Sequence, residues 1–213
     1  MNFQNIPLDH HFIPSVNKGM TTGHKLMIVL HGRGDTLDSY KTLTSEINVT
    51  GLNYLLLNAP FTESFGYTWY DDSFDLMDHR YLESLKRLKG VLSSCLSARI
   101  SPSDIFLFGF SQGARMVLDF FLHEEKKFAG VLALSPRMSH FEPFPKFNHL
   151  QCDTPLFVAH GLYDPIIPFQ ETSNELTTWQ SQMNNMIFES YEMAHEIDIL
   201  EIQKVRQWLN DYL

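Results

Sequence analysis

The pentapeptide G-F-S-Q-G at residues 109–113 has the pattern of a nucleophile elbow, a tight turn that presents a serine at its apex. An apolar, strand-like run at 105–108 precedes it and a helix-like run at 114–122 follows it, as the motif requires. So sharp a turn strains the backbone of Ser111 and leaves room only for small flanking residues, which explains the two glycines. Because such turns also occur without chemistry, the other candidate residues decide the interpretation.

Asp164 and His195 are the residues that would turn the Ser111 hydroxyl into a nucleophile. A serine needs a base to accept its proton and an acid to orient that base. The order Ser, Asp, His along the chain is that of α/β-hydrolases. His195 alone of the ten histidines follows the last predicted strand, and Pro165 favours an extended loop at Asp164. The alternatives are a simple Asp-Pro turn, a helix-capping or surface histidine, and Asp198 as a rival acid.

Two backbone N–H groups are expected to stabilise the negative charge that develops on the substrate oxygen. Gln112 directly follows the serine, so its N–H faces the same space. Arg33 lies in H-G-R-G-D at 31–35, after an early predicted strand, and its N–H is our choice for the second donor. A plain turn at the end of a strand would also explain this stretch.

An aromatic stretch at 61–74 is the candidate for a substrate pocket. Within it, Phe65, Trp69 and Tyr70 are predicted to line the space that receives the acyl group. Packing of the same rings over the edge of the sheet explains the composition equally well, so both interpretations stay open.

Short apolar runs alternate with helix-like stretches, and these elements must position the candidate residues. The alternation predicts an α/β fold, with a mostly parallel sheet covered by helices on both faces and an edge strand near 12–13, and the order of the candidate residues points to the α/β-hydrolase fold. Ligands of such sheets bind at the carboxyl ends of the strands, where the candidate residues are expected. Strands are predicted at 26–30, 54–57, 105–108, 130–134, 155–159 and 187–191, and helices at about 38–47, 76–98, 114–122, 170–183 and near the C-terminus.

Composition limits the classes of function. A length of 213 residues predicts one domain over 1–213, and a formal net charge of −9 argues against nucleic acid or an anionic membrane as partner. We find no signal peptide and no apolar run near the ~18 residues of a membrane span, so a cytoplasmic protein without stable membrane insertion is expected. Cys95 and Cys152 lack metal-ligand spacing and are expected to be free thiols; no metal is predicted. An apolar helix face looks the same in a core and in a dimer, so a homodimer stays open.

Together these motifs resemble the phospholipase/carboxylesterase family of small α/β-hydrolases, which includes acyl-protein thioesterases and bacterial carboxylesterases. The resemblance implies hydrolysis of carboxyl esters or thioesters without a cofactor, with Ser111, Asp164 and His195 as the triad and no large cap domain. It rests on L-H-G-x-G-D at 30–35, W-Y-D at 69–71, G-F-S-Q-G at 109–113, L-S-P at 134–136, H-G-x-x-D-P-x-I-P at 160–168 and the late His195.

Two positions depart from the pattern of that family. Arg33 occupies a position that is usually apolar, and a cation there would favour substrates with an anionic group. Ala114 stands where many members have a second glycine, and it is small enough to be tolerated.

The sequence therefore predicts a serine hydrolase that cleaves esters or thioesters of short to medium acyl chains through an acyl-enzyme intermediate. The substrate is expected to be a small-molecule or lipid-like acyl ester. The alternatives are an acyl-protein thioesterase or lysophospholipase, acyl transfer or peptide hydrolysis on the same triad, and a hydrolase fold retained for binding only.

Overall fold

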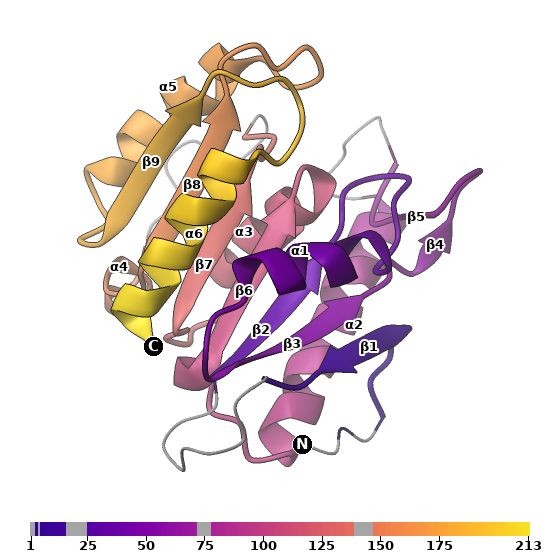
Figure 1. Cartoon of the computed structure of the whole chain (residues 1–213). Helices are drawn as coiled ribbons and strands as arrows, with labels where there is room; N and C mark the ends of the chain where they lie inside the picture. Colours follow the sequence, from indigo (N-terminus) through magenta and orange to yellow (C-terminus); the bar gives the residue numbers. More distant parts are fainter. Residues whose placement is uncertain (1–2, 4, 16–24, 72–77, 139–146) are drawn as a thin grey trace.

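A mostly parallel, seven-stranded sheet forms the centre of the computed structural model, which describes residues 3, 5–15, 25–71, 78–138 and 147–213 (Figure 1). Its strand order is β1-β3-β2-β6-β7-β8-β9, and only β1 at the edge runs antiparallel to its neighbour. The strands are β1 (His10–Ile13), β2 (Lys25–Leu30), β3 (Leu52–Leu57), β6 (Ile105–Phe110), β7 (Gly130–Leu134), β8 (Leu156–Gly161) and β9 (Met186–Tyr191).

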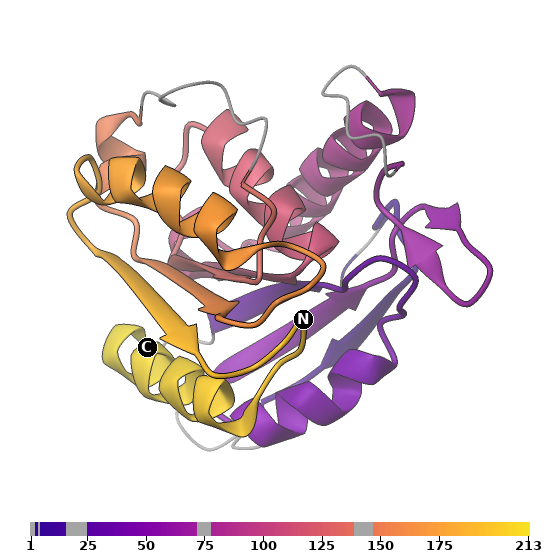
Figure 2. The ribbon, with the colours of Figure 1, turned by 90° about the horizontal axis from the view of Figure 1, so that it is seen from above.

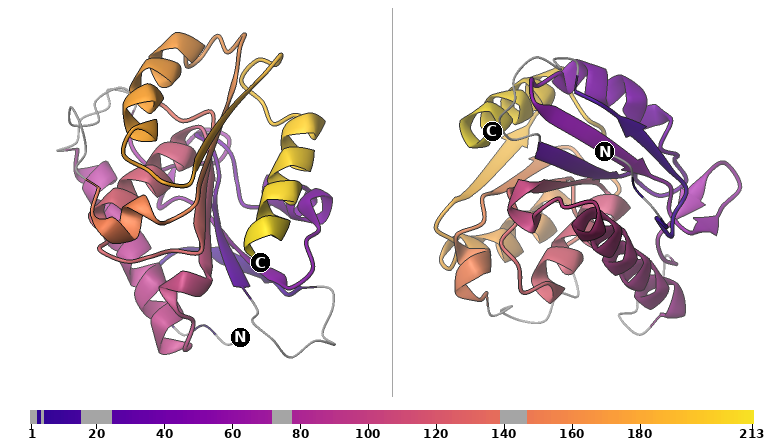
Figure 3. Two further views of the ribbon diagram at one scale, coloured as in Figure 1. Left: turned by 90° about the vertical axis from the view of Figure 1, so that its left-hand side faces the viewer. Right: turned by 90° about the horizontal axis from the view of Figure 1, so that it is seen from below.

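Helices cover both faces of this sheet, as predicted. The helices α1 (Ser39–Ile47) and α6 (Ile199–Tyr212) lie side by side on one face. On the other face lie α2 (His79–Ser97), α3 (Gln112–His123) and α5 (Phe169–Gln180), as Figure 2 and the left view of Figure 3 show. The described residues contain no helix long and apolar enough to cross a membrane.

The strand β2 shows why the central strands are continuous apolar runs. Leu26 and Ile28 pack into the core on the α3 side, whereas Met27 and Val29 pack into the core on the α1 and α6 side. Successive side chains of a strand point to opposite faces, and here both faces are covered, so every position must be apolar.

Several smaller elements differ from the predictions. The aromatic stretch contains a hairpin of two very short strands, β4 (Phe61–Thr62) and β5 (Tyr67–Thr68), and the helix α4 (His149–Cys152) lies between β7 and β8, where no helix is predicted. A single 3-10 turn, η1 (Pro102–Asp104), precedes β6. The predicted start of the second helix at 76 lies outside the described residues. No separate cap domain covers the sheet in the parts of the chain that the structure describes.

Candidate active site

Ser111 lies at the turn between β6 and α3 with a positive backbone φ of 54°. Its N–H donates to the carbonyl of Leu134 at 2.8 Å, which ties the turn to the end of β7. A side chain at Gly109 would collide with the backbone of Gly113, and one at Gly113 would collide with the carbonyl oxygen of Leu30. The two glycines are therefore required because three pieces of backbone meet at the elbow.

Two short hydrogen bonds join Ser111, His195 and Asp164. The Nε2 atom of His195 lies 2.7 Å from Ser111 Oγ, and its Nδ1 atom lies 2.6 Å from Asp164 Oδ2. A carboxylate only accepts hydrogen bonds, so Nδ1 carries the ring hydrogen and Nε2 is left to accept the serine proton. The three side chains follow the ends of β6, β8 and β9, which are remote in sequence, and they meet at one rim of the sheet although β7 lies between β6 and β8.

The carboxylate of Asp164 is fixed and kept ionised by its surroundings. Its Oδ1 atom accepts the N–H groups of Ile166 and Ile167, each at 2.8 Å. Burial alone would raise the pKa of Asp164, but the hydrogen bonds from Ile167, His195 and Ile166 outweigh it and hold the pKa below its usual value. The group is therefore a carboxylate at neutral pH, as an orienting acid must be.

A second histidine, His160, lies against the same carboxylate. It is fully buried, and its Nε2 atom lies 2.8 Å from the carbonyl oxygen of Ile167 and 3.3 Å from Asp164 Oδ2. Because a carbonyl only accepts, Nε2 carries a hydrogen. Burial lowers the pKa of His160, although the hydrogen bond to Ile167 acts in the opposite direction. This packed, neutral histidine fixes the loop that carries Asp164.

The two proposed oxyanion donors belong to segments that are held from several sides. Gln112 is the first residue of α3, so its N–H has no partner within the helix. Its side chain accepts the N–H of Trp69 at 2.8 Å and donates to the carbonyl of Tyr70 at 2.8 Å. In the Arg33 loop, the N–H of Gly34 donates to Tyr67 at 2.9 Å. These bonds hold both segments beside Ser111.

The Arg33 side chain is paired rather than directed at the serine. Its Nε and Nη2 atoms both donate to Glu63 Oε1, at 2.9 Å and 2.6 Å, and Nε also lies 3.1 Å from Glu63 Oε2. Glu63 belongs to the turn of the β4–β5 hairpin. The cation expected to favour anionic substrates is therefore largely compensated by a carboxylate of the protein.

The three predicted substrate contacts occupy different places. Tyr70 lines a cavity of about 160 Å³ together with Ser111. Trp69 is 0% exposed, and its indole N–H donates to the carbonyl of His31 at 3.0 Å. Phe65 is 94% exposed at the tip of the hairpin, where it lines a separate hollow with Glu63. Trp69 and Phe65 do not line the cavity at the serine.

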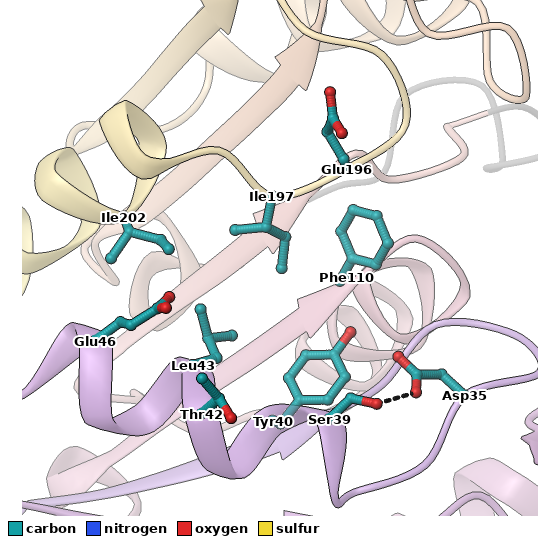
Figure 4. A pocket seen from close by; sticks show the side chains of 10 residues that line it. All are labelled: Asp35, Ser39, Tyr40, Thr42, Leu43, Glu46, Phe110, Glu196, Ile197 and Ile202. Atoms are coloured by element: carbon teal, nitrogen blue, oxygen red, sulfur yellow. Dashed lines mark hydrogen bonds between the residues drawn. The ribbon is translucent and has the colours of Figure 1, made fainter.

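A hollow of about 280 Å³ lies between α1 and the start of α6 (Figure 4). Phe110 lies in its wall, and the ring of Phe110 is 5.0 Å from the ring of His195. Ser111 does not line this hollow. Among the described residues, no group of three or more His, Cys, Asp or Glu side chains could hold a metal ion.

A sequence model of the family described as Phospholipase/Carboxylesterase matches residues 11–213. The chain belongs to the phospholipase/carboxylesterase family. Its relatives include acyl-protein thioesterase 1 of Kluyveromyces lactis, 31% identical over 209 residues that cover 88% of this chain and 92% of the relative. Acyl-protein thioesterase 1 of Emericella nidulans is 29% identical over 226 residues, which cover 93% of this chain and 92% of the relative.

Solved structures share the fold. The carboxylesterase of Bacillus cereus has a TM-score of 0.80 at 18% identity and covers 98% of this chain and 96% of its own. At this identity the likeness concerns the fold alone. Membership of the phospholipase/carboxylesterase family, together with the curated relatives, makes the protein a hydrolase of the esterase and thioesterase type.

Three further residues line the cavity of this phospholipase/carboxylesterase family member beside Ser111. Ile166 and Ile167 follow Asp164 in the H-G-x-x-D-P-x-I-P motif, and Arg137 follows the S-P dipeptide at the end of β7. The motifs do not single these residues out as substrate contacts. The available signal was their position, since each comes shortly after the carboxyl end of a predicted strand.

Proposed function

We propose that the protein is a serine hydrolase that cleaves carboxyl esters or thioesters of short to medium acyl chains. The observation that carries this proposal is the pair of hydrogen bonds, at 2.7 Å and 2.6 Å, that joins Ser111 to His195 and His195 to Asp164 at the edge of a cavity. The three side chains come from three separate loops. Their contacts and their order along the chain support the roles of nucleophile, base and orienting acid in a catalytic triad.

In the first half of the reaction, Ser111 Oγ attacks the substrate carbonyl carbon while His195 Nε2 accepts the hydroxyl proton. The carbonyl oxygen becomes an oxyanion, which the N–H groups of Gln112 and Arg33 stabilise. Asp164 stabilises the imidazolium. When the tetrahedral species collapses, the bond to the alcohol or thiol breaks and His195 returns its proton to that leaving group, which gives the acyl-enzyme.

In the second half, water replaces the leaving group. His195 accepts a proton from the water as its oxygen attacks the acyl carbon, and the same oxyanion donors stabilise the second tetrahedral species. Collapse breaks the bond to Ser111 Oγ, which recovers its proton from His195. The products are a carboxylic acid and the free enzyme, with no cofactor consumed.

The cavity supports a short acyl group. Its volume of about 160 Å³ is below the range of roughly 300–1,000 Å³ that is typical of sites for drug-sized ligands. Tyr70, Ile166 and Ile167 contribute apolar surface to its wall, against which a short hydrocarbon chain can pack.

Acyl-protein thioesterase activity is the second candidate. The names of the curated relatives favour it, and Ile166 is an exposed apolar residue, 59% exposed, in the cavity lining, where a longer chain could lie. A panel of esters and thioesters with one leaving group and acyl chains of two to sixteen carbons would separate the two candidates. An optimum at long-chain thioesters would replace our preferred substrate class.

A cytoplasmic location stays a prediction, and the sequence leaves a homodimer open.

Labelling with a fluorophosphonate probe tests the mechanism. We expect covalent labelling and hydrolysis of 4-nitrophenyl butyrate by the natural protein, and loss of both in Ser111→Ala. Ser93→Ala, on the exposed side of α2, is the matched control and should retain both. Activity that survives in Ser111→Ala would reject the assigned nucleophile, and a folded protein that neither reacts with the probe nor hydrolyses esters would favour a fold retained for binding.

A further inference from the structure

Arg137 places a second arginine in the wall of the cavity that contains Ser111. It follows β7 at the carboxyl edge of the sheet, three residues after Leu134, the residue whose carbonyl accepts the N–H of Ser111. The cavity lining among the described residues includes Arg33 and Arg137 and no Asp or Glu. The part of the wall that the structure describes therefore carries positive charge and no carboxylate.

The backbone around Arg137 is fixed from two helices. The carbonyl of Pro136 accepts the hydroxyl of Thr172 in α5 at 3.0 Å, and the carbonyl of Arg137 accepts Nη1 of Arg115 in α3 at 3.3 Å. The next residue, Met138, is completely buried in the core. The stem of the Arg137 side chain therefore starts from a held position, which lowers the entropy cost of binding a ligand there.

The guanidinium of Arg137 differs from that of Arg33 in its partners. Arg33 pairs with Glu63 through two of its nitrogen atoms, whereas the Arg137 side chain has no hydrogen bond or ion pair with any residue in the described parts of the chain. Arg137 is only partly exposed. A partly buried cation without a counter-charge is unfavourable, and an anionic group of a ligand would compensate it.

Tyr70 shows that this charge reaches the cavity. Burial raises the pKa of Tyr70, while the cations of Arg115 and Arg137 act in the opposite direction. Tyr70 and Arg137 both line the cavity that holds Ser111, so the positive charge lies at this cavity.

We propose that Arg137 is the specificity-determining cation of the site and that the preferred substrate carries a carboxylate, as in a monoester of a dicarboxylic acid. This inference rests on the proposed function, because it places the carboxylate relative to the ester that Ser111 attacks. One planar guanidinium matches one carboxylate in a bidentate pair. A cavity of about 160 Å³ fits a short dicarboxylic acyl group better than a bulky phosphorylated head group.

The experiment compares two esters that share chain length and leaving group, the 4-nitrophenyl monoester of adipic acid and 4-nitrophenyl hexanoate. We expect kcat/KM of the natural protein to be about tenfold or more higher for the adipate ester, because a charge-assisted pair typically contributes at least that much. Arg137→Met should lower this ratio about tenfold, mainly through KM, and Arg137→Lys should retain part of it. Arg137→Glu should make the hexanoate ester the better substrate.

Two further variants make the comparison specific. Lys86→Met removes one exposed positive charge on α2 and should leave the ratio unchanged. Arg33→Leu should change the ratio less than Arg137→Met, because Glu63 already pairs with that cation. The proposal is overturned if the natural protein shows no preference, if Arg137→Met retains it, or if Arg33→Leu has the larger effect. An acetyl ester of hydroxyphenyl phosphate tests a phosphate as the anionic group. If Arg137→Met lowers kcat/KM more for this ester than for the adipate monoester, the carboxylate proposal is overturned in favour of a phosphate.

Binding to a catalytically inert protein keeps the inference separate from the proposed function. Calorimetry on Ser111→Ala would compare adipic acid monoamide with hexanamide, neither of which needs to be hydrolysed. The inference is supported if Ser111→Ala binds adipic acid monoamide more tightly than hexanamide and the double variant Ser111→Ala, Arg137→Met does not. This holds even if the natural protein cleaves no ester. Equal binding of both amides rejects it even if ester hydrolysis is established.

Discussion

The carboxylate of Asp164 holds the Nδ1 atom of His195 at 2.6 Å from a position completely shielded from water. Its other oxygen is occupied by the N–H groups of Ile166 and Ile167, so the carboxylate cannot rotate without losing two bonds. The loop therefore presents one oxygen to the imidazole in a fixed direction. This arrangement selects the ring tautomer that leaves Nε2 as the acceptor for the serine proton.

Asp164→Asn is expected to lower kcat for ester hydrolysis by ~10³-fold or more, with a smaller effect on KM. The amide has the same shape, but its N–H₂ group can face the imidazole and favour the wrong tautomer. Steady-state kinetics with 4-nitrophenyl butyrate provide the measurement, and Asp153→Asn is the matched control outside the cavity lining. A variant with kcat within tenfold of the natural protein would remove Asp164 from the proposed triad.

Gly113→Ala is expected to destabilise the fold by about 1–3 kcal/mol or more, because the new methyl group would meet the carbonyl oxygens of Leu30 and His31. The matched control is Ala114→Gly, one residue along the same helix, which removes a methyl group instead of adding one. Ala114→Gly should lower the free energy of unfolding by only about 1 kcal/mol, through its lower helix propensity. Thermal unfolding followed by circular dichroism measures both, and a higher Tm for Gly113→Ala than for Ala114→Gly would contradict the close approach at the elbow.

The buried carboxyl of Glu201 is expected to make the protein less stable as the pH rises. Burial in the first turn of α6 raises its pKa from 4.5 to about 8, with the N–H of Asp198 acting in the opposite direction. Between those two values the folded state holds a proton that the unfolded state has released. The free energy of unfolding therefore falls by about 1.4 kcal/mol per pH unit in this window and becomes level above it.

Glu201→Gln should remove that contribution, so its stability advantage over the natural protein should grow from pH 5 to pH 8. Urea unfolding at each pH unit gives the free energies, and Glu175→Gln on the exposed side of α5 is the control. Parallel pH profiles for Glu201→Gln and the natural protein would show that Glu201 is not protonated in the fold.

Glu63→Gln tests the pair that compensates Arg33. Loss of the carboxylate should leave the Arg33 charge uncompensated by Glu63, so kcat/KM for the adipate monoester should rise about twofold to tenfold relative to the hexanoate ester. The stability should change by less than about 1 kcal/mol, because the pair is partly exposed to solvent. An unchanged substrate ratio would mean that Arg33 does not act on the substrate even when Glu63 no longer carries a charge.

Much of the fold and of the geometry of the site was predictable because both depend on local patterns. The central strands are apolar runs buried on both faces, and the elbow glycines are required by backbone contacts at the turn. Ser111, Asp164 and His195 meet because parallel strands end at one edge, so three strand ends suffice to predict their proximity. Their catalytic roles stay a proposal that the experiments above address.

The parts that were not predictable depend on contacts between segments that carry no periodic pattern. Strands of two residues, such as β4 and β5, are too short for an alternation of apolar and polar residues. The hairpin brings Glu63 to Arg33 and leads into Trp69, which is buried against residues remote in sequence, so neither the pairing nor the burial could be read from local sequence. No sequence motif singles out Arg137, because its place at the cavity depends on the hydrogen bonds that Thr172 and Arg115 donate to the backbone around it.

The strand β9 has a consequence for how the protein would lose activity. It forms one edge of the sheet, its residues are less buried than those of the central strands, and it leads directly to His195. Detachment of this edge would carry the imidazole away from the serine while the central strands stay paired. Heat inactivation would then precede the loss of overall structure, and enzymatic turnover would be a more sensitive gauge of damage than any spectroscopic signal averaged over the chain.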